Sequence, residues 1–297
     1  MQLKLPQVSV IIPTYNRRFL LERAINSVLN QTYADYELIV VDDASSDDTL
    51  NFITNKYPQQ VRLSSLPENR GSGGARNEGI KLARGNFIAF LDSDDEWLPN
   101  YLETQIKYID SELNPVLVFC GCFHHEQNGK TRKFSCSPWL KYPDLTYHLL
   151  AENFILTASL VVVRKQALQK AGCFNESLRV GQDKELFLRL FCIGNVVHVP
   201  HYLITKYSHA NNVTGNSHRW VKANFDILDA FFAHDLSRPY KHFETEARSH
   251  NAMRLARILW QEKKEFLLAV KMLAKAFFIS PVYMRQHIWK KIIKATT

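Results

Sequence analysis

The N-terminal third of the chain alternates β-branched runs with a segment of helical periodicity. Gln7–Ile12 (QVSVII) and Tyr36–Val41 (YELIVV) are typical of buried strands, and Arg18–Leu29 between them places apolar residues at helical spacing. A strand–helix–strand unit predicts a parallel pair, because the helix returns the chain to the starting edge of the sheet. The pattern then repeats with a strand at Val61–Ser65, a helix at Gly74–Ala83 and a strand at Phe87–Leu91. We therefore expect an α/β fold with a Rossmann-like, mostly parallel central sheet flanked by helices.

The loops after these strands are expected to share one edge of the sheet. They cover residues 13–17, 42–46, 67–73 and 92–96. Open α/β sheets bind their ligands at the carboxyl ends of the strands, so this edge is the predicted site. Further along, helices are predicted near 98–111, 165–171 and 183–191, a strand at 157–163, and only helices after Trp220.

Four acidic residues follow the strand in FIAFLDSDDEW (87–97) within five positions. Two arrangements would make their mutual repulsion tolerable. The residues form a turn exposed to water, or they form a site that a cation completes. In extended backbone Asp92 and Asp94 point to the same side, and hard divalent ions such as Mg²⁺ or Mn²⁺ prefer carboxylate oxygens. Acidic turns after strands are common, so the motif alone leaves both explanations open.

A second acidic pair, Asp42 and Asp43, closes a neighbouring strand. Five or more carboxylates around one ion would leave some uncompensated. At least one of this pair is therefore expected to accept hydrogen bonds from a neutral part of a ligand, such as a base or ribose. The alternative is a charge at a helix N-terminus, in a helix that begins near Asp47 and is capped by Ser45 or Ser46.

Gly71-Ser72-Gly73-Gly74 is not a dinucleotide-binding fingerprint, because Arg76 stands where the third glycine should be. We expect a flexible loop that opens a helix, with its backbone N–H groups near a phosphate.

Composition indicates a globular intracellular protein. Hydrophobic residues make up 46% of the chain, but no apolar run reaches the length of a membrane span or of a signal-peptide core. The five cysteines form no C-x-x-C pair and are expected to be reduced thiols. The predicted location is the cytoplasm, with a peripheral position at the inner face of the cytoplasmic membrane as an option.

The net charge of +8 belongs to the C-terminal tail. Residues 250–297 contain ten Lys or Arg against Glu262 and Glu265. Basic amphipathic helices with aromatic faces suit an anionic membrane surface. A helical lid or a homodimer face packed on the core is the alternative, and no nucleic acid is expected because no recognised binding module accompanies the charge.

Three stretches of the chain resemble family 2 glycosyltransferases, which have the GT-A fold. They are residues 8–49 (VSVIIPTYNRR to VVDDASSDDT), 68–97 (ENRGSGGARNEG to FLDSDDEW) and 157–190 (TASLVVVRKQ to QDKELFLRL). The resemblance implies a GT-A catalytic domain over 1–215, with a nucleotide-sugar half (1–98) and an acceptor half (99–215). The tail, 216–297, lies outside it and is expected to form a basic helical C-terminal extension.

The resemblance also implies how the nucleotide is held. Pro13, Thr14 and Tyr15 would border the base, with Tyr15 against its face and Asp43 on its polar edge. Asp92 would approach the ribose.

The remaining implied roles concern the phosphates and the reaction. Asp94 would ligate the metal that bridges the two phosphates, and Arg76 or Arg70 would help to hold the nucleotide. Asp183 would be the catalytic base, although Gln182 replaces the glutamate that commonly precedes it.

His209, in KYSHANN (206–212), would be a second metal ligand or a contact of the leaving group. A surface-loop histidine is the alternative.

We therefore expect a metal-dependent (Mn²⁺ or Mg²⁺), inverting hexosyl- or N-acetylhexosaminyltransferase. A nucleotide-sugar donor, with a UDP-sugar favoured, would react with a hydroxyl of a glycan or lipid-linked oligosaccharide acceptor in bacterial surface polysaccharide (lipopolysaccharide or capsule) biosynthesis. A nucleotidyltransferase is the alternative enzyme, but the glycines expected around Arg17 and Arg18 are absent. A non-catalytic nucleotide-sugar-binding protein is the other alternative, and the intact Asp92, Asp94 and Asp183 argue against it.

Overall fold

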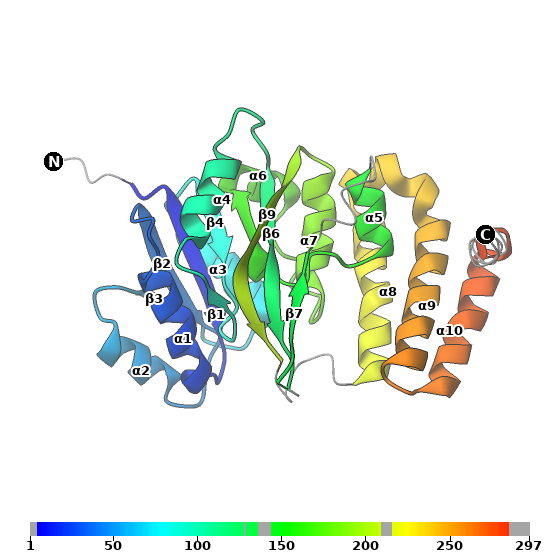
Figure 1. Ribbon diagram of the computed structural model, residues 1–297, viewed down its shortest axis with the longest axis horizontal. Coiled ribbons are helices and arrows are strands. Elements are labelled where there is room, and N and C mark those ends of the chain that lie inside the picture. The colour runs from blue at the N-terminus through cyan, green and yellow to red at the C-terminus, as the bar shows by residue number, and fades with distance from the viewer. Residues whose placement is uncertain (1–4, 128, 136–143, 209–215, 285–297) are drawn as a thin grey trace.

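The computed structural model of the protein describes residues 5–127, 129–135, 144–208 and 216–284. Nine strands form one sheet in the order β3-β2-β1-β4-β8-β6-β9-β5, and β7 pairs with β6 (Figure 1). The strands are β1 (Val8–Thr14), β2 (Tyr36–Asp42), β3 (Arg62–Ser65), β4 (Phe87–Phe90), β5 (Glu96–Trp97), β6 (Leu117–His125), β7 (Thr131–Phe134), β8 (Val161–Arg164) and β9 (Val196–Tyr207).

The sheet is parallel in its first half and mixed in its second. β1 pairs in parallel with both β2 and β4, and β2 with β3, as the strand–helix–strand pattern predicts. β8 then lies antiparallel between β4 and β6, while β6 and β9 run parallel to each other. The short β5 pairs antiparallel with β9 and so brings the segment after the acidic loop onto the far half of the sheet.

The central strand β1 is longer than the sequence suggests, because it includes Pro13. The backbone carbonyl of Thr14 faces β2, where it accepts from the N–H of Asp43 at 2.8 Å. Adjacent residues of a strand face opposite neighbours, so the backbone of Pro13 faces β4, whose paired residues end opposite Ile11. The missing N–H of proline therefore removes no bond of the sheet.

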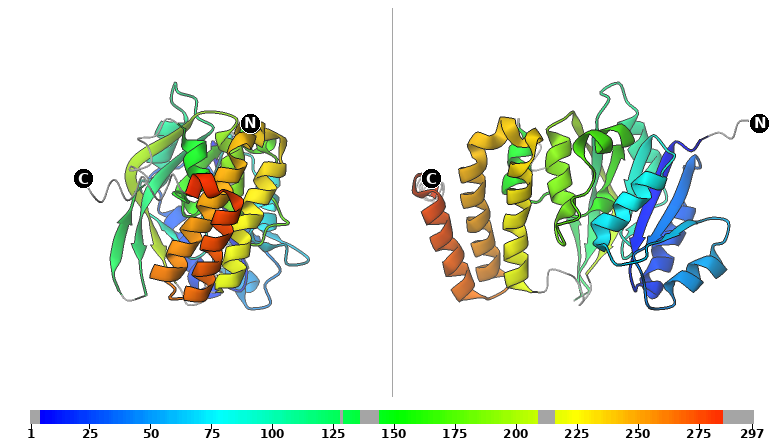
Figure 2. Two further views of the ribbon diagram at one scale, coloured as in Figure 1. Left: turned by 90° about the vertical axis from the view of Figure 1, so that its right-hand side faces the viewer. Right: turned by 180° about the vertical axis from the view of Figure 1, so that it is seen from behind.

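Helices cover both faces of the sheet (Figures 1 and 2). They are α1 (Arg18–Leu29), α2 (Thr49–Lys56), α3 (Gly71–Leu82), α4 (Tyr101–Ile109), α5 (Leu145–Ala151), α6 (Lys165–Ala171), α7 (Gln182–Phe191), α8 (Ser217–Ala233), α9 (Glu244–Gln261) and α10 (Phe266–Ile279), with 3₁₀ helices η2 (Ala158–Leu160) and η4 (Asp235–Phe243). α1 and α4 share one face, where the side chain of Gln31 bonds Leu102. α3 and the α6–α7 segment share the other, where Asn77 bonds Phe174.

Most of the predicted elements are confirmed, and the differences have local causes. The helix predicted from Gly74 begins at Gly71, and the strand predicted over 157–163 starts with the η2 turn. β5 and β7 were not predicted, since one is two residues long and the other is largely exposed. No disulfide joins two of the four described cysteines, and Cys136 lies outside the described residues.

The helices after residue 216 stack in chain order beyond α7 (Figure 1). α8 belongs to the main hydrophobic core through Ile227, Leu228, Phe231 and Phe232. A second core joins the first half of α8, through Val221 and Phe225, to α9 and α10. The predicted boundary at 215/216 therefore falls just before a helix whose second half completes the main core.

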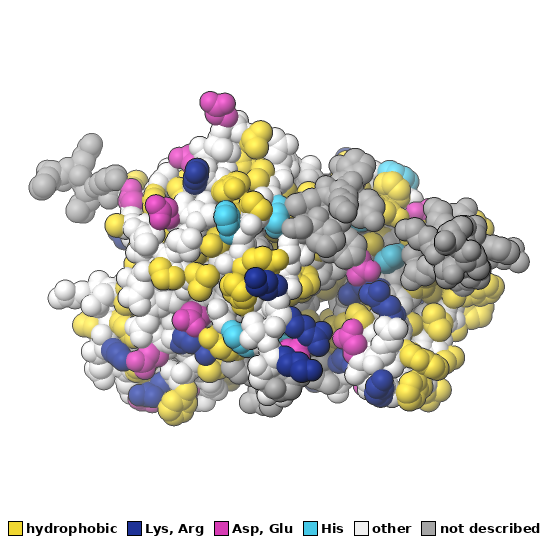
Figure 3. All heavy atoms as spheres, viewed as in Figure 1, with side chains coloured by type: hydrophobic (Ala, Val, Ile, Leu, Met, Phe, Trp, Pro, Cys, Tyr) yellow, Lys and Arg dark blue, Asp and Glu magenta, His cyan; other side chains and the backbone are white. Residues whose placement is uncertain are grey.

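The outer face of α10 leaves large apolar side chains exposed, among them Leu267 at 73% and Phe278 at 81%. Figure 3 shows hydrophobic side chains gathered at this end of the molecule. No helix among the described residues has both the length and the apolarity to cross a membrane.

Truncation tests how α8 contributes to the core. A chain ending at residue 215 loses four side chains that each stabilise the fold by about 1.5–3 kcal/mol, a sum that matches the stability of a typical domain. We expect that chain to aggregate, and a chain ending at residue 243 to unfold cooperatively in urea. Cooperative unfolding of the shorter chain would contradict the shared core.

Candidate active site

A pocket of about 530 Å³ opens at the carboxyl edge of the sheet, where the sequence predicts a site. The loops after β1, β2 and β4 line it, together with the N-termini of α3 and α7. The part of the chain after β5 contributes Leu156, residues 179–181 and Lys206 of β9. Both halves of the sheet are therefore needed to form the pocket.

The acidic loop forms one wall. Asp92, Asp94 and Asp95, called here the aspartate cluster, bring carboxylate oxygens within 4.8 Å of one another. Such a group is stable only if positive charge lies close by, and each carboxylate has a different cation as its partner.

Asp92 is held from two sides. One carboxylate oxygen accepts from Nη2 of Arg76 at 2.5 Å, and the other accepts from Oγ1 of Thr157 at 2.6 Å. Burial alone would raise the pKa of Asp92, but the charges of Arg76 and Lys206 and the hydrogen bonds lower it to about 2. Asp92 is therefore ionised at neutral pH and fixed in place.

Asp95 lies beneath the pocket and is fully buried. Its Oδ2 accepts from Oγ of Ser159 at 2.7 Å, and its Oδ1 lies 3.6 Å from Nζ of Lys206. Burial raises the pKa of Asp95 to about 7, and the charges of Asp92 and Asp94 add to this effect although Lys206 opposes it. Oδ1 has no hydrogen-bond donor among the described residues.

Asp94 faces the pocket, and its carboxylate accepts a hydrogen bond from Arg17. Arg17 is one-third exposed, whereas the side chain of Arg76 is 7% exposed. Asp94 is thus the member of the cluster whose cationic partner lies nearest to solvent. Three carboxylates, one of them with a buried oxygen that accepts no hydrogen bond from the described residues, fit a hard divalent cation.

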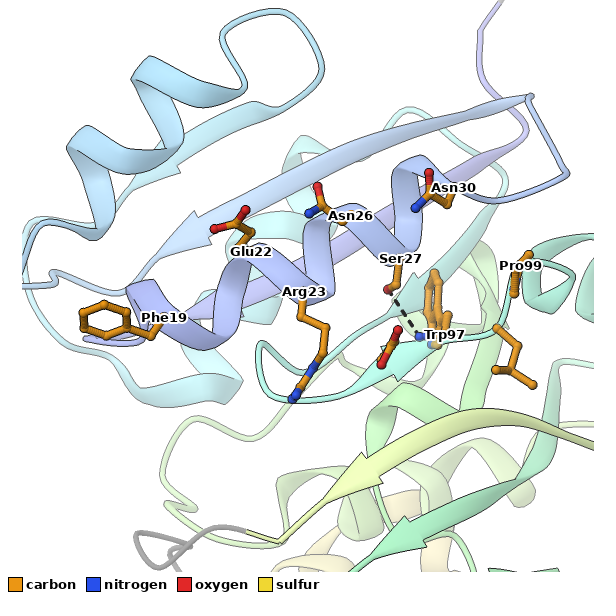
Figure 4. A pocket seen from close by; sticks show the side chains of 10 residues that line it. Phe19, Glu22, Arg23, Asn26, Ser27, Asn30, Trp97 and Pro99 are labelled. Atoms are coloured by element: carbon orange, nitrogen blue, oxygen red, sulfur yellow. Dashed lines mark hydrogen bonds between the residues drawn. The ribbon is translucent and has the colours of Figure 1, made fainter.

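Helix α1 anchors the acidic loop from behind (Figure 4). Arg23 donates from Nη2 to the backbone carbonyl of Asp94 at 2.7 Å and lies 3.7 Å from the ring of Tyr207. Oγ of Ser27 accepts from the backbone N–H of Trp97 at 3.2 Å. These residues line a second, polar hollow of about 470 Å³ whose walls hold the loop in position.

Asp43 caps a helix, but not the helix expected from the sequence. Its two carboxylate oxygens accept from the backbone N–H groups of Arg70 and Gly71, each at 2.8 Å, at the start of α3. This explains why α3 begins at Gly71. The raised pKa of Asp43 arises from burial, and the two N–H groups partly offset it.

The predicted capping of the next helix by Ser45 or Ser46 is wrong. Oδ1 of Asp47 accepts from the backbone N–H of Thr49 at 3.0 Å at the start of α2. Oγ of Ser45 instead accepts from the N–H of Asn16 and ties together the loops after β1 and β2.

Pro13, Thr14 and Tyr15 line the pocket together with Asp43. Tyr15 is exposed, so its ring is free to meet a planar ligand. The hydroxyl of Thr14 is buried without a partner among the described residues. Unpaired buried polar atoms at a pocket are typical of a site that a ligand completes.

The arginines around the pocket differ in whether a carboxylate binds them. Arg76 donates to Asp92, and Arg70 pairs with Glu176 at 2.7 Å, so both predicted nucleotide contacts are held by carboxylates. Arg179 lines the pocket, is exposed, and has no ion pair within the described part of the chain. It covers Gly71, where a Cβ atom would lie 2.7 Å from its Nη1. No local sequence signal identifies Arg179.

Asp183, the predicted base, lies in the first turn of α7 and lines the pocket. Its Oδ1 accepts from the N–H of Lys184 at 2.8 Å. Burial raises its pKa, which the charge of Arg76 opposes.

Gln182 is buried against Gly73, where a Cβ atom would lie 3.4 Å from the Cγ of Gln182. His209 lies outside the described residues.

The fold and the pocket define a GT-A-type glycosyltransferase. The family model for glycosyl transferase family 2 matches residues 9–172. The sequence is 31% identical over 235 residues to the Escherichia coli UDP-Glc:alpha-D-GlcNAc-diphosphoundecaprenol beta-1,3-glucosyltransferase WfgD, covering 78% of this chain and 89% of that one. The chain belongs to glycosyl transferase family 2.

Two solved structures share the fold. TarS 1–349 of S. aureus in complex with UDP-GlcNAc superposes with a TM-score of 0.64 and 22% identity, over 91% of this chain and 81% of that one. The mannosyltransferase PcManGT of Pyrobaculum calidifontis in complex with GDP-Man and Mn2+ gives 0.63 and 19%, over 99% and 81%. The predicted fold class is confirmed.

The pH dependence of stability tests the burial of Asp95. Because its pKa is raised from 3.8 to about 7, the folded protein keeps a proton that the unfolded chain has released within this range. The contribution of Asp95 to the free energy of unfolding should therefore fall as pH rises from about 4 to about 7 in EDTA. Asp95→Asn should remove this contribution and make the slope of stability against pH more positive in urea titrations, whereas the exposed Asp235→Asn should not. An unchanged slope in Asp95→Asn would contradict the assignment.

Proposed function

We propose that the protein transfers a hexosyl or N-acetylhexosaminyl unit, with inversion, from a nucleotide diphosphate sugar to a hydroxyl of a glycan acceptor. The observation that carries the proposal is the aspartate cluster, set in one pocket with the loops after β1 and β2 on one side and Asp183 on the other. The aspartate cluster and the two loops would bind the donor, and Asp183 would act on the acceptor.

The donor nucleoside would lie on the loops after β1 and β2. Thr14 offers an unpaired hydroxyl and Tyr15 an exposed ring for the base. Asp43 already accepts two backbone N–H groups, but each of its oxygens keeps a lone pair for a polar edge of the base. Arg179 is the cation of this wall without a carboxylate partner among the described residues, and it suits a phosphate. A UDP-sugar is favoured because the names of WfgD and of the TarS complex refer to UDP-sugars.

Asp94 would hold Mn²⁺ or Mg²⁺, with Asp92 toward the ribose and Asp95 behind them. Such an ion offsets the negative charge that develops on the departing nucleoside diphosphate. Arg17 forms an ion pair with the carboxylate of Asp94, so the metal ion and Arg17 would compete for that carboxylate. Arg17 lines the same pocket and can turn to a phosphate oxygen once displaced.

Asp183 would be the catalytic base. Inversion needs the acceptor hydroxyl to lose its proton as its oxygen attacks the anomeric carbon, and a positioned carboxylate takes that proton. Burial raises the pKa of Asp183, which makes its carboxylate a stronger base than an exposed aspartate.

The acceptor is proposed to be a lipid-linked glycan of bacterial surface polysaccharide biosynthesis. The name of WfgD describes a diphosphoundecaprenol-linked acceptor. The exposed apolar face of α10 carries Leu267 and Phe278, with Lys271 and Lys275 on the same helix. An apolar face with nearby lysines suits an anionic membrane, which would place the protein peripherally at the inner face of the cytoplasmic membrane.

Two other functions fit less well. A nucleotidyltransferase needs a glycine-rich basic phosphate loop near its start, and the glycines expected around Arg17 and Arg18 are absent. A non-catalytic binding protein has no need for a carboxylate such as Asp183 at the acceptor side.

Donor binding and turnover should separate in two variants. Asp94→Ala should abolish the Mn²⁺-dependent part of UDP binding in calorimetry, because the cation loses its outermost ligand. Asp183→Asn should bind UDP with Mn²⁺ nearly as the unchanged protein does and lower turnover at least about 10²-fold, the range for losing a general base.

Equal loss of UDP affinity in both variants would contradict this division of roles. A thermal-shift screen of UDP-, GDP- and dTDP-sugars with Mn²⁺ identifies the donor to use. If none of them stabilises the protein, the proposed function fails.

Membrane attachment is tested by changing the apolar face of α10. Leu267→Ser with Phe278→Ser should lower cosedimentation with phosphatidylglycerol vesicles at least about tenfold, because two exposed apolar side chains are lost. Phe19→Ser is the matched control, since Phe19 is similarly exposed on α1. Equal binding of all three proteins would rule out this face as the attachment site.

A further inference from the structure

A group of positive charges lies next to the proposed base, outside the donor pocket. Lys184 follows Asp183 on α7, Arg254 and Arg257 come from α9, and Glu152 follows α5. These side chains lie close enough that their charges shift one another's pKa values. We call Lys184, Arg254 and Arg257 the basic cluster.

Lys184 is only 4% exposed and lacks a strong partner. Its Nζ donates to the backbone carbonyl of Leu150 at a long 3.5 Å. Within the described part of the chain it forms no ion pair. Burial lowers its pKa to about 7, and the charge of Arg254 acts in the same direction.

Arg254 also forms no ion pair within the described part of the chain. Its Nη2 donates to two neutral amide oxygens, Oδ1 of Asn224 at 2.6 Å and Oδ1 of Asn251 at 3.1 Å. Its Nε is buried and has no acceptor among the described residues. Arg257 is exposed and lies 4.0 Å from Glu152.

Acidic side chains do not balance this charge. Glu152 is the one carboxylate within 4.0 Å of the basic cluster among the described residues, and it also lies 3.5 Å from His250. The remaining segments, 1–4, 128, 136–143, 209–215 and 285–297, contain no Asp or Glu. A buried cation without a counter-ion costs several kcal/mol, so the fold keeps a charge that does not stabilise it.

We propose that the basic cluster binds the phosphate or diphosphate through which the acceptor glycan is attached to its carrier. The inference rests on the proposed function and specifies its acceptor. Lys184 and Asp183 are neighbours at the start of α7, so an acceptor sugar whose hydroxyl reaches Asp183 brings its linking phosphate toward the basic cluster. Figure 3 shows a hollow between the sheet and the C-terminal helices, with Lys and Arg side chains gathered on both sides.

The test uses inorganic pyrophosphate as the probe, in EDTA so that no metal takes part. Pyrophosphate should bind the full chain in calorimetry and raise its Tm. Arg254→Gln should weaken this binding at least about tenfold, because charge-assisted hydrogen bonds are lost. Arg248→Gln is the matched control, since it makes the same change on α9 at a residue paired with Glu244 and Asp229.

Lys184→Met separates a binding role from a structural one. If Lys184 is kept for an anion, its replacement by an apolar side chain should raise the Tm of the ligand-free protein by about 2 °C or more and weaken pyrophosphate binding. A lower Tm with unchanged pyrophosphate binding would overturn the inference.

The source of the phosphate is tested by competition. A short-chain prenyl diphosphate sugar should displace pyrophosphate, and phosphatidylglycerol in bicelles should not. Displacement by phosphatidylglycerol alone would make the site a membrane contact and overturn the inference. If pyrophosphate has no effect on a protein that binds UDP with Mn²⁺, this inference fails and the proposed function stands. If UDP does not bind either, both fail.

Discussion

The balance of charge around the aspartate cluster is the constraint on which the rest of the site depends. Three adjacent carboxylates at the end of β4 would repel one another, and three cations from distant parts of the chain prevent this. Arg17 comes from the loop after β1, Arg76 from α3 and Lys206 from β9. Hydroxyls of Thr157 and Ser159 add hydrogen bonds from the segment before β8. The cluster therefore becomes stable only when both halves of the sheet are assembled.

The three pairs differ in how easily their cation can be replaced. Arg76 is buried and Lys206 lines the pocket beside a fully buried carboxylate, whereas Arg17 is the most exposed of the three cations. Replacement of a surface arginine costs little, because water solvates the released guanidinium. The ion pair of Asp94 is therefore the one that a ligand can replace most easily, while the ion pairs of Asp92 and Asp95 stay in place. The basic cluster beside Asp183 differs in this respect, because Glu152 is the one carboxylate within 4.0 Å of it among the described residues.

The sequence predicts what local patterns and short connections determine. The bounds of α1, the parallel first half of the sheet and the meeting of four loops at one edge follow from periodicity and from strand–helix–strand geometry. The order of the second half does not follow, because antiparallel pairs such as β4 with β8 join segments more than 70 residues apart. The two-residue strand β5 carries no periodicity at all.

The same distinction between local sequence patterns and long-range contacts applies to the candidate site. Asp43, Asp92 and Asp183 were located from motifs, and all three line the pocket. Arg179 and Lys206 were missed, since each lies in a segment without a motif and reaches the pocket only through the tertiary fold. The capping prediction for α2 failed because Ser45 found a partner across the sheet edge, in the loop after β1.

The position of a bound metal tests the central claim most directly. Crystals soaked with MnCl₂ and UDP, measured at the manganese absorption edge, would locate the ion by its anomalous scattering. The account predicts one strong peak between the carboxylate of Asp94 and the diphosphate, with Arg17 turned away and the base beside Tyr15. A peak elsewhere, or bound UDP with Arg17 still on Asp94 and no peak, would contradict it.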